Sequence, residues 1–335
     1  MTRFSSEATS GFYDFDIVPL SGAHLSEIWI LWKAQYKEEL SAGGKIPNRW
    51  DSYREEIQSL LRKRVKSDYA MVAETRNEIV GYMFFDVFPF HNEQTAFCPI
   101  IGHATKQAHR REISEKLYQS LSKKLVTDGI LNHTITYFAH DEGLKETVFE
   151  LGFGLIVVDA FRGLNTFSSS VSSINIIRAD SSHIDVVEAL GEEARGYYLE
   201  APLFLTRKKQ PHDYYHRLFS EDAAIFLAFS RNEPVGLMQI RKNKELDPMT
   251  LSDTNTGLID QMGAYIKPTF RRQGIGRALL LKCVQWCQHR GITRIHVDFE
   301  SANLSARPFW LEYFTAALHS ARRTVYRDIL GPQQT

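Results

Sequence analysis

The stretch from Ile266 to Leu279 reads IKPTFRRQGIGRAL, and it joins an apolar run to a segment with helical periodicity. A glycine turn that opens a helix points successive backbone N–H groups at one place, where the helix dipole also favours an anion. Gly274 and Gly276 have no Cβ, so the backbone can approach a phosphate closely. The spacing excludes a Rossmann fingerprint, whose third glycine would be Leu279, and a Walker A loop, because no Gly-Lys-Ser/Thr follows. The stretch predicts either a phosphate cradle of another kind or an ordinary turn.

The chain contains two copies of one pattern. Gly129-Ile130 and Gly291-Ile292 each end a segment with helical periodicity, and they lie 162 residues apart. The string Arg-Asn-Glu, followed by Val-Gly, recurs at 76–81 and 231–236 between two apolar runs, which is typical of a β-hairpin. Ordered matches at nearly constant shifts indicate a duplicated unit of about 160 residues.

A serine-rich stretch separates the copies. Residues 165–173 contain five serines, a composition typical of a linker or surface loop. We therefore expect two domains, over residues 1–166 and 174–335. Strands and helices mix in each copy without strict alternation, which predicts a mixed α/β fold and excludes a doubly wound one.

The order of elements is clearest in the second copy. Strands are expected at Ile174–Arg178, Ala224–Phe229, Val235–Arg241, Leu258–Ile266, Arg294–Glu300 and Thr324–Asp328. Helices are expected at 182–193, 212–219, 274–291 and 304–311, the third of them ending at Gly291, a residue type that commonly follows a helix.

Composition and charge narrow the class of protein. The chain has 40 Lys and Arg against 40 Asp and Glu, which argues against a nucleic-acid binder whose affinity depends on a basic surface but leaves a local basic patch open. Cys98, Cys283 and Cys287 are too few for a disulfide framework and indicate a reducing compartment. Cys283 and Cys287 lie four residues apart on an expected helix, where two small core residues are more common than a metal pair.

Neither a leader nor a membrane anchor is expected. Residues 1–14 are polar and lack the apolar core of a signal peptide. No run approaches the roughly 18 apolar residues that a membrane span requires. These features predict a soluble, cytoplasmic protein without a membrane partner.

The whole constellation of the second copy resembles the GNAT acetyltransferases. Arg271-x-x-Gly274-x-Gly276 after a strand is similar to the family's motif A, and Asn303-x-x-Ala306-x-x-Phe309-Trp310 is similar to a run near its last helix. The resemblance implies tandem domains, each with a mostly antiparallel central sheet flanked by helices, and acetyl-CoA as co-substrate without a metal. The residues that would contact acetyl-CoA are Ala264, Tyr265, Ile266, Arg271, Arg272, Gln273, Gly274, Ile275, Gly276, Arg277, Asn303 and Trp310.

The first copy has the order of elements without the loop chemistry. At the shift of 162 residues, His109, Glu112 and Ser114 stand in place of Arg271, Gly274 and Gly276. A carboxylate at Glu112 would repel a pyrophosphate. We expect a degenerate copy that shapes the acceptor pocket, with Arg110 and Arg111 forming a basic turn that is either solvated or binds an anion.

Candidate bases lie on two strands. Alternation puts His296, Asp298 and Glu300 on one strand face. By resemblance, Asp298 stands where similar members carry a catalytic glutamate, and Asp260 matches the glutamate of the histone-acetylating branch. We rank Asp298 first and Asp260 second, although each carboxylate can instead simply line the open side of its strand. His296 is a third candidate, because imidazole titrates near neutral pH.

The leaving thiolate has a less clear proton donor. Family members often carry a tyrosine where this sequence has Trp310, and indole has no proton to give. Tyr313, one turn further on, can substitute or can be a core aromatic. A thiol with a pKa of about 8.5 leaves without strong acid help, so the activity does not depend on this donor.

The acceptor is the least determined partner. The segment after the first strand of the second copy holds Tyr197, Tyr198, Tyr214 and Tyr215 with Arg195 and Glu200, which suits a small amine, an amino-sugar or a peptide end. These residues suit an interface with the first copy equally well.

Three functions follow, in order of preference. The first is an N-acetyltransferase that moves an acetyl group from acetyl-CoA to a primary amine in the second domain. The others are a non-catalytic acyl-CoA-binding regulator, and a tandem acetyltransferase similar to mycothiol synthase. The oligomeric state stays open.

Overall fold

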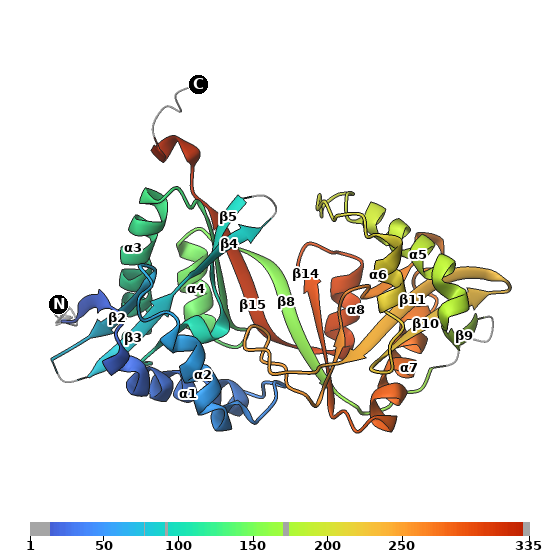
Figure 1. Ribbon diagram of the computed structural model, residues 1–335, viewed down its shortest axis with the longest axis horizontal. Coiled ribbons are helices and arrows are strands. Elements are labelled where there is room, and N and C mark those ends of the chain that lie inside the picture. Colours follow the sequence, from blue (N-terminus) through green and yellow to red (C-terminus); the bar gives the residue numbers. More distant parts are fainter. Residues whose placement is uncertain (1–13, 77, 91–92, 170–173, 331–335) are drawn as a thin grey trace, which may run out of the picture.

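The computed structural model describes residues 14–76, 78–90, 93–169 and 174–330. Most of the polar N-terminal stretch, Asn77 in the first expected hairpin turn and part of the serine-rich stretch lie outside these ranges. Two halves of similar architecture lie side by side, each with helices packed on a sheet (Figure 1).

In the first unit, helices come both before and after the β2–β3 hairpin in the sequence, and the unit ends with a long strand. Its strands and helices are β1 (Asp16–Pro19), α1 (Leu25–Ser41), α2 (Arg54–Arg62), β2 (Ala70–Glu74), β3 (Ile79–Phe84), β4 (Asp86–Phe90), β5 (Glu93–Cys98), β6 (His103–Thr105), α3 (Arg110–Thr127), β7 (Asn132–Phe138), α4 (Glu142–Glu150) and β8 (Gly154–Gly163).

The second unit repeats this plan. Its elements are β9 (Ile174–Arg178), α5 (Ile184–Tyr197), α6 (His212–Arg217), β10 (Ala223–Ser230), β11 (Glu233–Lys242), β12 (Thr256–Ile259), β13 (Ala264–Ile266), α7 (Ile275–His289), β14 (Arg294–Glu300), α8 (Ala306–Tyr313) and β15 (Thr315–Thr324). The pairings repeat as well: β5 runs parallel to β7 as β12 does to β14, and β6 pairs with β3 as β13 does with β11. The structure confirms the mixed α/β fold and the duplication.

Two strand predictions are wrong. The strand expected at Leu258–Ile266 is two strands, because residues 260–263 leave the ladder at Gln261 (φ 52°) and Gly263 (φ 59°). The buried side chain of Gln239 provides hydrogen bonds for the residues that leave the ladder. Its Nε2 donates to Gln261 Oε1 and its Oε1 accepts from Met262 N, both at 3.0 Å. The strand expected at Thr324–Asp328 is instead β15, which ends at Thr324.

The last strand of each unit pairs with a strand of the other unit. In the long sheet the order is β4-β5-β7-β15-β8-β14-β12-β11-β10-β9. Strand β15 of the second unit lies between β7 and β8, and β8 of the first unit lies between β15 and β14, so one sheet runs through both halves (Figure 1). The alternation of residues predicts that a segment forms a strand but not which strand it pairs with. The sequence therefore did not reveal that the last strand of each unit pairs with the other unit, an arrangement that we call strand exchange.

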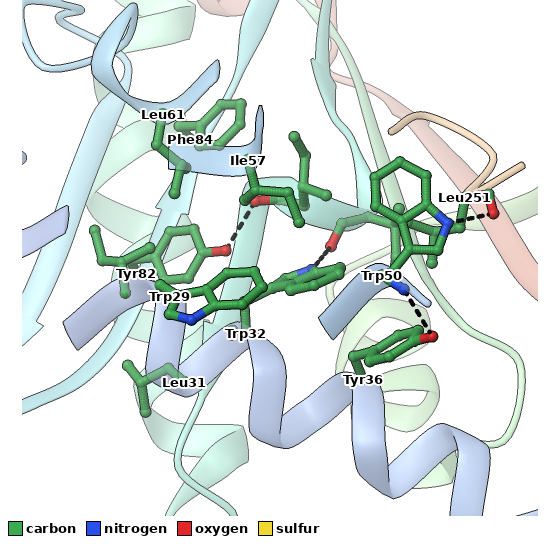
Figure 2. Close-up of a cluster of buried hydrophobic side chains, with 14 of the residues drawn as sticks. Trp29, Leu31, Trp32, Tyr36, Trp50, Ile57, Leu61, Tyr82, Phe84 and Leu251 are labelled. Atoms are coloured by element: carbon green, nitrogen blue, oxygen red, sulfur yellow. Dashed lines mark hydrogen bonds between the residues drawn. The ribbon is translucent and has the colours of Figure 1, made fainter. Parts of the chain in front are cut away.

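The core of the first unit also crosses the boundary. Ala317 and Leu318 of β15 are fully buried in it together with Trp32. Trp50 is buried too, and its indole Nε1 donates to the carbonyl oxygen of Leu251 in the second unit at 2.6 Å (Figure 2). The two units therefore share a hydrophobic core and a sheet.

The cysteines are free and buried, and Cys283 and Cys287 pack in the core of the second unit, as expected. Within the described ranges, no set of three or more His, Cys, Asp or Glu side chains is arranged to hold a metal ion. None of the helices in those ranges has the length and apolar character to cross a membrane.

Candidate functional site

A cavity of about 1210 Å³ opens in the second unit where β13 and β14 separate. Strand β12 pairs with β14 only as far as Ile259 and Val297, and β13 then pairs with β11 instead. The break at residues 260–263 therefore creates the space. Its walls come from β13, the glycine loop, β14, α8 and the ends of α5 and α6.

The glycine loop is one wall, and it opens α7 as expected. Gly274 is the residue before the helix and has φ 80°, a left-handed conformation that costs a residue with a Cβ. Within the described structure no side chain caps this end of α7, so the first N–H groups are left for another acceptor. Such a helix start is suited to a phosphate.

Gly276 permits close packing beside this helix start. A Cβ there would lie 3.2 Å from Ile266 Cδ1 and 3.2 Å from Phe309 Cε2, both on residues that line the cavity. Any larger side chain would push into one of these neighbours.

Arg271 fixes the shape of the loop. Its Nε donates to the carbonyl oxygen of Ile266 at 3.0 Å, and Nη1 donates to Ser305 Oγ at 3.3 Å. Its guanidinium also lies 4.4 Å above the ring of Tyr197. In the structure this side chain ties β13, α8 and α5 together.

The residues expected to contact the coenzyme come together at this cavity, with one exception. Gln273 does not line it and donates from Nε2 to the carbonyl oxygen of Thr269 at 3.1 Å. The side chain of Asn303, which is buried, accepts at Oδ1 from Ala306 N and from the Tyr197 hydroxyl. The lining residues of the expected set are Ala264, Tyr265, Ile266, Arg271, Arg272, Gly274, Ile275, Gly276, Arg277, Asn303 and Trp310.

Asp298 faces the cavity from β14. Its side chain is exposed to the open space of the cavity. The protein around the cavity desolvates this carboxyl and, together with the charge of Asp159, raises the pKa of Asp298 to about 6. The alternate residues Ile295, Val297 and Phe299 pack in the core, as the alternation predicts.

Asp260 also lines the cavity but has a partner of its own. The guanidinium of Arg241 donates to both of its oxygens: Nε lies 2.8 Å from Oδ1, and Nη2 donates to Oδ2. This bidentate geometry occupies both oxygens of the carboxylate.

His296 does not line the cavity. It is buried on the same side of β14, with Nε2 2.9 Å from Asp159 Oδ1 on β8 of the first unit. Its ring lies 4.8 Å from that of Phe161 on the same strand. The exchanged strand therefore covers this imidazole.

Tyr313 and Trp310 line the cavity from α8. Trp310 is 5% exposed and packs edge-on against Phe309 and Phe314, with centroids 4.9 and 5.4 Å apart. Tyr313 lines the cavity, and burial followed by contact with Glu312 raises its pKa, so its hydroxyl keeps its proton at neutral pH.

The aromatic residues expected at the acceptor side do line the cavity. Tyr197, Tyr198, Tyr214, Tyr215 and Arg195 all contribute to its wall, whereas Glu200 does not.

The expectation missed Arg207, whose guanidinium lies 3.7 Å from the ring centroid of Tyr198 and donates to Glu300 Oε1 at 3.1 Å. The basic run Arg207-Lys208-Lys209 was the signal, since Arg207 and Lys208 both line the cavity.

The corresponding loop of the first unit is filled by ion pairs. The residue before α3 is His109, which has a left-handed backbone (φ 61°), so His109 and not Glu112 corresponds to Gly274. The constant 162-residue offset fails here because α3 has 18 residues and α7 has 15. Arg110 donates to Asp141 Oδ2 at 2.6 Å and to Glu38 Oε2 at 2.9 Å, and Arg111 pairs with Glu115 and Glu150. The two arginines of this turn are thus already neutralised by carboxylates.

The comparisons agree with this architecture. The family described as "Acetyltransferase (GNAT) family" matches residues 187–314, which contain the cavity walls just described. A search of the curated proteins finds no significant match.

Solved structures share the fold at low identity. A GCN5-related N-acetyltransferase from Sphaerobacter thermophilus is 12% identical, with a TM-score of 0.54 over 92% of this chain and 95% of that one. A GCN5-related glucosamine N-acetyltransferase region of a fungal multi-domain GH3 β-N-acetylglucosaminidase is 10% identical, with a TM-score of 0.52 over 92% of this chain and 38% of that one.

The family match falls on the unit that keeps the glycine loop, and the fold is shared over nearly the whole length of both chains with the first of these structures. The second unit therefore contains a region that matches the GNAT acetyltransferase family model, and the chain as a whole shares the fold of a GCN5-related N-acetyltransferase.

Proposed function

We propose that the second unit is an N-acetyltransferase that moves the acetyl group of acetyl-CoA directly to a primary amine. The observation that carries the proposal is the meeting of an uncapped left-handed helix start and a carboxylate of raised pKa in one cavity. The helix start at Gly274 is suited to the pyrophosphate, and Asp298 is suited to the amine proton.

The raised pKa makes Asp298 the better base of the two carboxylates. An alkylamine with a pKa of about 10.4 is neutral in only about one molecule in 10³ near pH 7, so the acceptor must lose a proton before it attacks. A carboxylate that titrates near 6 accepts that proton more readily than one near 3.9. Both oxygens of Asp260 accept from the guanidinium of Arg241, which leaves this carboxylate less free to take the amine proton.

Tyr313 is the proton donor available to the departing thiolate. Its phenol keeps its proton at neutral pH and reaches the cavity wall, whereas the neighbouring indole of Trp310 has no labile proton of suitable acidity. Because a thiolate leaves readily, we expect a modest contribution from Tyr313.

Replacing Asp298 by Asn tests the base. We expect kcat/KM to fall by roughly 10²- to 10⁴-fold, the range typical of general bases, with the acetyl-CoA Kd unchanged within about twofold. Steady-state kinetics over a panel of small amines, amino-sugars and peptide N-termini, with calorimetry for acetyl-CoA, separates the two quantities. Asp128→Asn removes a carboxylate that bonds Tyr69 far from the cavity and serves as the matched control. Full activity in Asp298→Asn would exclude this residue as the base.

The pH dependence follows from the same carboxylate. Protonated Asp298 cannot accept the amine proton, so kcat/KM is expected to fall about tenfold per pH unit below pH 6, where its pKa lies. A pH–rate profile of the wild-type enzyme measures this limb. A limb centred near pH 4 would contradict the assignment.

A non-catalytic acyl-CoA-binding protein is the second candidate. The indole at Trp310, where many relatives carry a phenol, favours it. Acetyl-CoA binding without turnover across the whole panel would support this function in place of the transferase.

A further inference from the structure

Strand β8 of the first unit carries a carboxylate beside β14, the strand that bears Asp298. In the antiparallel pairing of β8 with β14, Asp159 is directly opposite Asp298. Asp159 Oδ1 lies 2.9 Å from His296 Nε2, and these two residues are only 6% and 3% exposed. Asp159 therefore lies against His296 and opposite Asp298, and of these three residues only Asp298 lines the cavity.

The other titratable groups near Asp159, His296 and Asp298 have partners of their own or are neutral. Asp260 is held by Arg241, and Glu300 accepts from Arg207 at 3.1 Å. Asp247 accepts from Met249 N and Thr250 Oγ1, both at 2.9 Å. His319 on β15 pairs with Val158, the residue before Asp159, and burial lowers its pKa, so it stays neutral at pH 7. The charges of Asp159 and His296 act most strongly on Asp298, ahead of those of Asp260 and Glu300, which raise its pKa further.

A buried ion pair is a costly way to hold two strands together. Desolvation of both charges offsets most of their attraction, and apolar residues of similar volume often pack as well or better. The strands β8 and β14 already pair over seven positions, from Arg294 to Glu300. The ion pair between Asp159 and His296 is therefore not needed to join the strands, and we look for its role in the site.

We propose that Asp159 of the degenerate first unit is a positioning residue of the active site in the second unit. It anchors His296 and, from its place opposite Asp298, keeps the proton affinity of that carboxylate high. The inference rests on the proposed function for the role of Asp298 as base. It gives the first unit a part in the reaction although its own loop is filled by ion pairs.

The signs of the two charges make the proposal specific. The negative charge of Asp159 opposes ionisation of Asp298, and the imidazolium of His296 favours it, with Asp159 the stronger of the two. Burial lowers the pKa of His296, but the hydrogen bond and charge of Asp159 outweigh it and raise that pKa. Loss of either partner should therefore move Asp298 in opposite directions.

Carboxyl ¹³C NMR measures the titration of Asp298 without any need for turnover, and Asp298→Asn identifies the resonance. In Asp159→Asn we expect the pKa of Asp298 to fall by roughly one unit, and in His296→Asn to rise by a similar amount. Asp159→Glu should keep the wild-type value, and Asp128→Asn serves as the control. Unchanged titration in both single variants, or shifts of the same sign, would overturn the proposal.

Folding and function are kept apart in this design. If circular dichroism shows that either single variant fails to fold, the double variant Asp159→Asn/His296→Asn is used, in which amides replace the ion pair. The pKa of Asp298 should still fall in the double variant. An unchanged pKa there would overturn the proposal. Where turnover is found, the acidic limb of kcat/KM should move with the NMR value. If the amine panel shows no turnover, the transferase fails, while the titration still decides the link between Asp159 and Asp298.

Discussion

Gly274→Glu is expected to reduce acetyl-CoA affinity by at least about 100-fold. The new carboxylate would face the place where the pyrophosphate must lie, and a residue with a Cβ at φ 80° is strained, which favours a distorted loop. A 100-fold loss corresponds to about 2.7 kcal/mol of binding free energy. Calorimetry with acetyl-CoA measures the change.

The same helix offers a matched control for this variant. Gly291 follows the other end of α7, has φ 68° and has nothing within 4 Å of the position of a Cβ. Gly291→Glu introduces the same charge and a similar backbone strain away from the cavity, so it should lower thermal stability and leave the acetyl-CoA Kd unchanged. Equal loss of binding in both variants would show that the effect comes from helix stability and that the loop is not the cradle.

The second unit, expressed alone as residues 174–335, is expected not to form a stable fold. Strand β14 would lose β8 over seven residues, and β15 would lose both of its neighbours. Ala317 and Leu318, fully buried in the core of the first unit, would be exposed. Open strand edges with apolar residues aggregate. Circular dichroism, size-exclusion chromatography and acetyl-CoA calorimetry should show an aggregated or unfolded chain that does not bind.

Co-expression supplies the control for this truncation. Residues 1–166 contain β7 and β8, so providing them as a separate chain should restore a soluble complex that binds acetyl-CoA. A fragment 174–335 that is monomeric, cooperative in thermal melting and able to bind on its own would contradict the dependence on the exchanged strands.

Local features of the chain were accessible from the sequence because their causes are local. The glycines at the two ends of α7, the alternation along Arg294–Glu300 and the paired hairpins depend on residues only a few positions apart. The same reasoning failed at residues 260–263, where a buried Gln239 from another strand supports the break. It also failed at the start of α3, because the duplicated units differ in helix length.

The sequence by itself determined that the chain is a duplicated mixed α/β protein with one intact glycine loop, and it indicated Asp298 on the open face of a strand. Only the tertiary structure decided which strands pair across the two units, and hence that Asp159 lies opposite Asp298 and against His296. The physical reason is that hydrogen-bonding patterns make a strand competent to pair but do not specify its partner. That choice is made by burial of side chains such as Phe161 and Leu318, which are far apart in sequence and meet in one shared core.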